Sequence, residues 1–295
     1  MNKKSILALL LVFAALLSMS TAAWAEEPHQ SRAVIGANLN EEEINTVYGL
    51  LGVPRGSVPE LRVTNAEERQ ALEGYVDSAV IGTRSISSVY VELLEEGSGM
   101  NVSTCNITWC TGEMYISALA TAGITDAKIV VAAPYAVSGT AALTGIYKAY
   151  EDMTGRKLDD LAKLVSTQEL TVTGELAEEI GSMDSTSIVN ELKLMLNETV
   201  NMSDGEIREQ VKRIADSYGV NLTDKQIQQL IDLCRSLEGL NPQELRSRVE
   251  EAQDTLRKVS RAKNEVVGFV QSTAKVIRTL KSFFDRLSEL FGWGD

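Results

Sequence analysis

Residues 101–155 constrain the fold most, because they read as strand, helix, strand and helix with a stop signal at nearly every junction. Gly123 follows an apolar helical face and is a typical left-handed helix end. Residues 129–133 are apolar at every position, which indicates a strand covered on both faces. Pro134 is expected to end that strand, since proline cannot donate to a ladder. Ser138 is expected to cap the next helix.

A β-hairpin is predicted just before this block. Residues 86–94 carry apolar side chains at alternate positions, and residues 95–99 have the composition of a turn. Met100 would begin the return strand, which continues into the central stretch. Residues 26–155 are therefore expected to form an α/β domain with a small mixed sheet.

The composition changes after Gly155. No convincing strand pattern follows Lys157, and helical segments with capping signals succeed one another with short connections. Residues 156–240 are predicted to be a helical region, and residues 241–295 a long amphipathic helix. The fold class is thus α+β, with a mixed α/β N-terminal unit followed by an all-α C-terminal bundle that has a long last helix.

The last helix carries a seam of apolar positions that alternate four and three residues apart, which is typical of a coiled coil or a bundle. Self-association through this seam is one expectation, and packing on the rest of the chain is the alternative. The same segment is basic, although the chain as a whole has a formal net charge of −13. A strongly acidic chain makes nucleic acid a poor partner.

Basic side chains beside an aromatic and apolar face are typical of a helix that lies in an anionic interface. We therefore interpret the end of the chain as a candidate contact with an anionic membrane surface or a cell-wall polymer. If the seam instead packs against other helices, the basic side chains form only a solvated face. The candidate surface-binding residues are Lys275, Arg278, Lys281, Phe283, Phe284, Arg286, Leu287, Phe291 and Trp293.

The first 25 residues have the pattern of a secretory signal peptide. Lys3 and Lys4 precede an apolar run over residues 6–17, which is too short to span a bilayer. Ala23-Trp24-Ala25 is an A-x-A cleavage site, so cleavage between Ala25 and Glu26 is expected. The protein is therefore predicted to be secreted, with association to the cell wall or membrane surface as a further possibility.

The chain has three cysteines, and two of them, Cys105 and Cys110, are five residues apart. If the strand runs through Thr108, the two are too far apart for a disulfide. If residues 108–110 turn back, a small loop would allow one. Both alternatives stay open at this point. Cys234 shares an apolar helical face and is expected to be a buried thiol.

Motifs that carry chemistry are scarce. His29 is the single histidine, which excludes a histidine-based triad and a histidine-rich zinc site. No phosphate-binding glycine motif occurs, so no cofactor, metal or catalytic residue is assigned. Ser138-Gly139 at a helix start could bind an anion through backbone N–H groups, although a plain cap is favoured.

Two classes of function remain. The favoured one is a secreted or envelope-associated protein of unknown biochemical function that binds or interacts without enzymatic activity. The alternative is a carboxylate-dependent hydrolase that acts on cell-wall material, which needs two carboxylates about 5–10 Å apart across a cleft. Acidic pairs such as Glu95-Glu96 are many, and the sequence does not show whether any two face each other.

Four segments have a distinctive sequence: residues 34–39, 63–69, 86–90 and 106–145, of which the most specific part is Ala133-Pro134 followed by residues 138–145. In these segments the chain resembles the YpuA-like family of predicted secreted proteins from Gram-positive bacteria. The resemblance covers nearly the whole chain after the signal segment. It implies secretion and a Gram-positive origin. The family is a domain of unknown function, so it supplies no catalytic residues.

Overall fold

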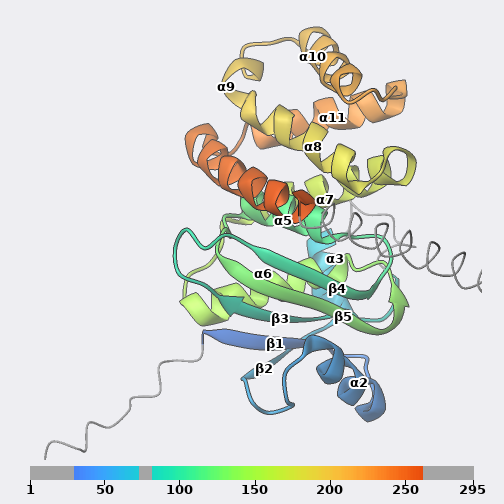
Figure 1. The fold of residues 1–295 in the computed structure, drawn as a ribbon, viewed down its shortest axis with the longest axis vertical. Helices are drawn as coiled ribbons and strands as arrows, with labels where there is room; N and C mark the ends of the chain where they lie inside the picture. Colours follow the sequence, from blue (N-terminus) through green and yellow to red (C-terminus); the bar gives the residue numbers. More distant parts are fainter. Residues whose placement is uncertain (1–29, 73–81, 262–295) are drawn as a thin grey trace, which may run out of the picture. The chain divides into compact units, whose positions relative to one another are not determined.

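The structure is a computed structural model that describes residues 30–72 and 82–261 (Figure 1). Its sheet has five strands in the order β2-β1-β3-β5-β4. β1 pairs with β2, and β4 with β5, in parallel, whereas β3 is antiparallel to both of its neighbours. Four strands therefore run in one direction, and their carboxyl ends lie along one edge of the sheet. The strands are β1 (Ser31–Gly36), β2 (Glu60–Val63), β3 (Ser88–Leu93), β4 (Asn101–Ile107) and β5 (Ala127–Val137).

The predicted hairpin is wrong, because β5 lies between β3 and β4 and pairs with both. The turn over residues 94–100 instead crosses the start of β5. Asp126 holds it there: its backbone oxygen accepts from Leu94 N at 3.1 Å, and its Oδ1 accepts from Gly99 N at 2.8 Å. Residues 95–99 do form a turn, as their composition indicates. The sequence of β3, the turn and β4 does not reveal that β5, which comes later in the chain, lies between the two strands.

β5 does not end at Pro134, as the sequence suggested, but continues to Val137. The register between β4 and β5 shifts between Cys105 and Ile107, so the proline stands in an irregular part of the ladder. Asn106 adopts a left-handed conformation there (φ 58°), and its Nδ2 donates to Ala133 O at 2.9 Å. At a bulge, the missing N–H of a proline breaks no ladder bond.

Helices cover both faces of the sheet. α2 (Glu41–Leu51) begins at a capping box and packs on one face, over Ala33 and Ile35 of β1. α5 (Gly112–Ala122) and α6 (Ala141–Thr154) pack on the other, and α3 (Asn65–Leu72) lies against α6. Alternate strand residues thus face alternate helix layers, as the pleat requires.

Ser138 does not cap α6. The helix begins at Ala141, its N-cap residue is Thr140, and no side chain bonds to the first turn. Gly139 adopts φ 97° immediately before it, where an added Cβ would meet Ile107 Cγ2 and lie 2.8 Å from the Tyr115 hydroxyl. The chain needs this glycine to turn from β5 into α6 against buried side chains. The plain Ser138 cap, which the sequence favoured over an anion site, is therefore not formed.

Beyond Gly155 the described residues form helices with short connections and no strand, which confirms the α+β class. The capping boxes at Ser203 with Glu206 and at Thr223 with Gln226 are both present. α7 packs on α5 and α8, and α10 packs on α11. None of the helices in the described ranges has the length and apolarity of a membrane span. The helices are α7 (Asp160–Ile180), α8 (Ser182–Leu194), α9 (Leu196–Thr199), α10 (Asp204–Ser217) and α11 (Asp224–Leu237), followed by helical residues 242–261.

The first part of the predicted C-terminal seam is buried. Leu245 and Val249 belong to the core formed by α7 to α11, and Ala252 and Leu256 to the core between the sheet and α5. For residues 242–261 the packing alternative therefore applies, and the helix lies beside α5 in Figure 1, in red-orange. The candidate surface-binding residues Lys275 to Trp293, and the cleavage site at Ala25–Glu26, lie outside the described residues.

Candidate ligand-binding cleft

A cleft of about 680 Å³ opens at the edge of the sheet where β4 and β5 end and β3 begins. Ligands of open α/β sheets bind most often at the carboxyl ends of the strands. We call it the aromatic cleft, because Trp109 and Tyr135 stand in its wall. Its lining residues are Gly82, Thr83, Arg84, Ile86, Ser87, Thr108, Trp109, Tyr135, Ala136, Val137, Ser138, Thr140, Ala141 and Glu178.

The bulge at Asn106 lies next to this cleft. Four residues of β5, 133–136, stand opposite the single residue Asn106, because Cys105 pairs with Ala132 and Ile107 with Val137. The extra length carries Tyr135 out to the surface, where it is 42% exposed. Among the described residues, Asn106 is the one non-glycine residue with positive φ. Bulges and left-handed residues of this kind recur beside functional sites, where they redirect side chains.

Trp109 joins the cleft to α7. Its Nε1–H donates to Glu178 Oε1 at 2.8 Å, and its ring packs directly on Gly174. A Cβ at Gly174 would collide with Trp109 Cη2 and Cζ2, so the backbone of α7 packs directly against the indole ring. The ring is consequently held in one position by a hydrogen bond at one end and by close packing at the other.

Arg84 and Tyr135 also line the cleft. Arg84 Nη1 donates to the Tyr135 hydroxyl at 3.2 Å, and its Nη2 donates to Asn38 O at 2.8 Å and lies 3.8 Å from Glu43 Oε2. A guanidinium has five N–H donors. Hydrogen bonds to the described residues use two of them, so the group is fixed and still has donors for a ligand.

The segment that carries Arg84 is anchored from behind by buried polar groups. Ser85 N donates to Asn38 Oδ1 at 2.8 Å, and Ser85 Oγ donates to the buried carboxyl of Glu68. Burial raises the pKa of Glu68 to about 7, although the hydrogen bond from Ser85 opposes the shift. Gly36 lies so close that a Cβ there would stand 2.5 Å from Ser85 O.

Carboxylates that face one another across a cleft would favour the hydrolase. Among the described residues that line the aromatic cleft, Glu178 is the one carboxylate and Arg84 the one cation. A second cleft, of about 600 Å³ between α3, α6 and α7, has three carboxylates. Each of them is paired: Lys148 lies 2.6 Å from Glu67, and Lys163 lies 3.0 Å from Glu151 and 2.9 Å from Asp160.

Comparison with known proteins agrees with the sequence resemblance. Residues 35–277 match a family described as "Protein of unknown function (DUF1002)". The chain belongs to this family. It is 35% identical over 260 residues to "Uncharacterized protein YpuA" of Bacillus subtilis (strain 168), and the match covers 87% of this chain and 88% of that protein. No solved structure matches it.

A deeply buried polar cluster of this DUF1002 chain lies away from the aromatic cleft. Lys193 and Glu169 are both enclosed, and Lys193 Nζ also donates to Ser117 Oγ at 3.0 Å and to Thr121 Oγ1 at 3.2 Å. Burial lowers the pKa of Lys193, and the charge of Glu169 opposes that shift. The charges are paired with each other and with the hydroxyls of α5, so the cluster links α5, α7 and α8 structurally.

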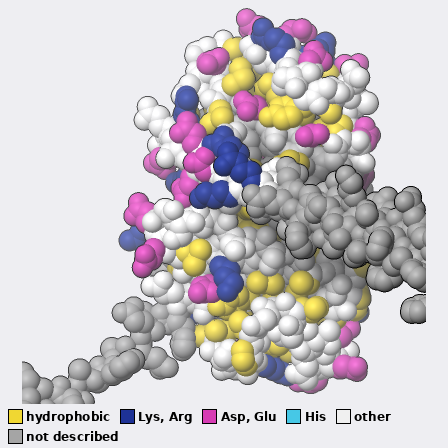
Figure 2. All heavy atoms as spheres, in the orientation of Figure 1, with side chains coloured by type: hydrophobic (Ala, Val, Ile, Leu, Met, Phe, Trp, Pro, Cys, Tyr) yellow, Lys and Arg dark blue, Asp and Glu magenta, His cyan; other side chains and the backbone are white. Residues whose placement is uncertain are grey.

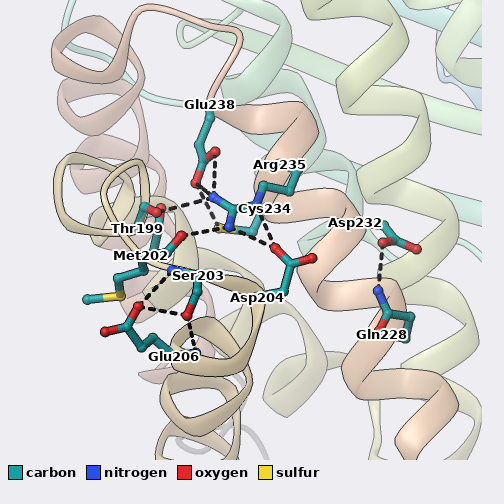
Figure 3. A network of polar contacts seen from close by, with 10 residues as sticks. All are labelled: Thr199, Met202, Ser203, Asp204, Glu206, Gln228, Asp232, Cys234, Arg235 and Glu238. Carbon is teal, nitrogen blue, oxygen red and sulfur yellow. Dashed lines mark hydrogen bonds and ion pairs between the residues drawn. The ribbon is translucent and has the colours of Figure 1, made fainter.

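A second polar network surrounds Arg235 (Figure 3). Its guanidinium donates to Asp204 Oδ1 at 2.7 Å and to both oxygens of Glu238 at 3.0 Å. It also reaches the backbone oxygens of Thr199 and Met202 at 3.3 and 2.7 Å. Arg235 is thus saturated with partners that hold α9, α10 and α11 together, in contrast to Arg84.

The cysteines of the DUF1002 chain are free thiols. β4 ends at Ile107 and residues 108–110 bend, so the strand does not run through Thr108, and no disulfide joins Cys105 and Cys110 in the structure. Burial raises the pKa of Cys110 to about 12, so its thiol is unreactive at neutral pH. Cys234 is buried, as predicted.

Sequence reasoning did not select Arg84, Trp109, Tyr135 or Glu178 as site residues. They come from four segments that are far apart in the chain, and no local spacing connects them. The sequence contained one weak indication of the site, the family motif that includes Asn106 and Pro134, because these two residues lie on the two strands of the bulge. Within the described ranges, no group of three or more His, Cys, Asp or Glu side chains is placed to hold a metal ion.

Proposed function

We propose that this DUF1002 protein is an exported, envelope-associated binding protein without enzymatic activity, and that its ligand enters the aromatic cleft. The export part of the proposal is supported by the signal pattern over residues 1–25. The binding part is supported by a preformed concave site that combines fixed aromatic rings with a few polar groups.

The observation that carries the proposal is that Glu178 has no second carboxylate beside it among the described lining residues. Glu178 accepts a hydrogen bond from Trp109 Nε1. A glycosidase of the usual kind needs a second carboxyl group about 5–10 Å away, one as acid and one as base or nucleophile. The aromatic cleft therefore suits binding better than the hydrolase.

The basic C-terminal segment remains a second proposed contact, with an anionic membrane surface or wall polymer. In the described part of the last helix, Arg246 pairs with Glu250, Arg248 with Glu244, and Arg257 with Asp254. On the face drawn in Figure 2, acidic and basic side chains likewise lie beside one another. An uncompensated basic surface would therefore draw on the exposed Lys258 and Arg261 and on residues beyond 261, such as Lys275 to Trp293.

A sedimentation assay with isolated cell walls tests the proposal. The chain that begins at Glu26 is compared with Ala136→Trp, because Ala136 is exposed and lines the cleft, so an indole there obstructs it. Val200→Trp is the matched control, since Val200 is 56% exposed and lies outside the cleft lining. We expect Ala136→Trp to weaken wall binding at least about tenfold, equivalent to about 1.4 kcal/mol, and Val200→Trp to bind like the wild type.

Equal binding by the wild type and Ala136→Trp would reject the aromatic cleft as the site. If, in that case, a chain that ends at Arg261 failed to bind the walls, the contact would lie in the C-terminal segment instead. Release of soluble wall fragments by the wild type, abolished in Glu178→Gln, would favour the hydrolase over the binding protein.

A further inference from the structure

The aromatic cleft combines three kinds of contact surface. Tyr135 presents an exposed ring. Arg84 is a planar donor and Glu178 a planar acceptor, and both side chains stand in the wall of the same cleft. Hydroxyl groups complete the lining, from Thr83, Ser87, Thr108, Ser138 and Thr140.

From this lining we infer that the ligand of the aromatic cleft is an uncharged saccharide with free neighbouring hydroxyls; the inference rests on the proposed function. A sugar ring has a face of C–H groups, which packs on an aromatic ring, and a rim of hydroxyls, each of which needs a donor or an acceptor. A guanidinium donates parallel N–H bonds and a carboxylate accepts two O–H bonds, so the pair matches neighbouring hydroxyl groups.

The charge of the lining decides between a neutral and an anionic ligand. Arg84 and Glu178 offset each other within the cleft, and Glu43 Oε2 lies 3.8 Å from Arg84 Nη2. A polyanion needs a concentrated positive field, which a single cation with acidic neighbours does not supply. Hydrogen bonding to hydroxyls needs no net charge, so the neutral saccharide fits better than a phosphate polymer.

The groups that would contact the sugar are fixed in advance. Trp109 is held by Glu178 and Gly174, and Arg84 by Asn38 and the Tyr135 hydroxyl. Fixed side chains lose little conformational entropy when the ligand binds. The arrangement is therefore that of a preformed sugar site, and no rearrangement of the cleft is required.

Tryptophan fluorescence reports binding directly. The chain has three tryptophans, and in a protein that begins at Glu26 and carries Trp293→Phe, Trp109 is the one that remains. The probe is a β-1,4-linked glucose tetrasaccharide, because each of its rings has free neighbouring hydroxyls at C2 and C3, and polyglycerol phosphate is the anionic comparison. Both are titrated at low and high salt, with calorimetry as an independent measure of binding.

We expect the tetrasaccharide to bind with an affinity that does not depend on salt, and to change the emission of Trp109. Tyr135→Ala should weaken binding about tenfold or more, whereas Tyr135→Phe should stay within about threefold of the wild type. Leu164→Ala is the matched control, because Leu164 is an exposed apolar residue outside the cleft lining, and it should bind normally.

Absence of tetrasaccharide binding in both measurements would overturn the inference. So would salt-sensitive binding of polyglycerol phosphate that is lost in Arg84→Met, because the ligand would then be anionic. In either case the proposed function would still hold if the wild type binds cell walls and Ala136→Trp does not. Failure of the wall assay as well would reject both.

Discussion

Lys193 Nζ lies 2.9 Å from Glu169 Oε1, and both side chains are buried, with 0% and 1% of their surface exposed. The pair joins α8 to α7, and its other partners, Ser117 and Thr121, belong to α5. α5 is part of the α/β layer, whereas α7 and α8 begin the helical region. A shared polar core therefore connects the two regions that differ in composition.

Removing one member of this pair should be costly. Lys193→Met leaves the carboxylate of Glu169 buried without its cation, and we expect a loss of about 3–5 kcal/mol in the free energy of unfolding. The double variant Lys193→Met with Glu169→Leu replaces the pair by apolar groups and should recover most of that loss. Urea denaturation measures both. A single variant that costs under about 1 kcal/mol would mean that the pair is solvated in solution.

Glu68 should make the stability of the protein depend on pH. Its folded pKa, about 7, is above its ordinary value of 4.5, so between these values the folded state holds a proton that the unfolded state has lost. Stability therefore falls as pH rises from about 4.5 to 7, by on the order of 3 kcal/mol, and the contribution of Glu68 is constant above that window.

Glu68→Gln is expected to remove this dependence and to raise stability at pH 8, because the amide can still accept from Ser85. Glu95→Gln is the control, since Glu95 is exposed. Urea midpoints from pH 4 to pH 9 compare the three proteins. The same fall in stability in Glu68→Gln as in the wild type would show that another group is responsible.

Gly174→Ala should disturb the aromatic cleft from the side of α7. The added methyl collides with the ring of Trp109, so the indole has to move and its bond to Glu178 weakens. We expect a cost of about 1–3 kcal/mol and a shift in Trp109 emission. Gly49→Ala is the matched helix control: nothing lies within 4 Å of its added Cβ, so it should stabilise α2 by about 0.5–1 kcal/mol. An unchanged emission spectrum in Gly174→Ala would contradict the packing described.

Features that depend on neighbouring residues were predictable from the sequence. The capping box at Asn40 and Glu43 and the left-handed helix end at Gly123 are present, because each needs only a few adjacent residues. The hairpin was wrong because strand order is decided by β5, a later strand. Pro134 was misjudged because the bulge that accommodates it is made by Asn106, on a different strand.

The aromatic cleft could not be predicted in the same way. Trp109 and Glu178 are 69 residues apart and are brought together by packing of α7 against α5. Arg84 meets Tyr135 across 51 residues, and only after segment 82–87 is fixed against Asn38 and Glu68. Composition and spacing do not predict such contacts. The position of the cleft at the sheet edge, beside the bulge, can be inferred only once the strand order is known.

Binding of a ligand beside Trp109 is tested most directly by NMR on the 15N-labelled chain that begins at Glu26. The indole N–H of Trp109 donates to Glu178 and lines the cleft, and Trp293 gives a second indole signal as an internal reference. Upon addition of the β-1,4-linked glucose tetrasaccharide or of solubilised wall fragments, we predict a saturable shift of the Trp109 signal, absent in Ala136→Trp. A shift of the Trp293 signal alone, with that of Trp109 unchanged, would show that the ligand binds at the C-terminal segment and not in the aromatic cleft.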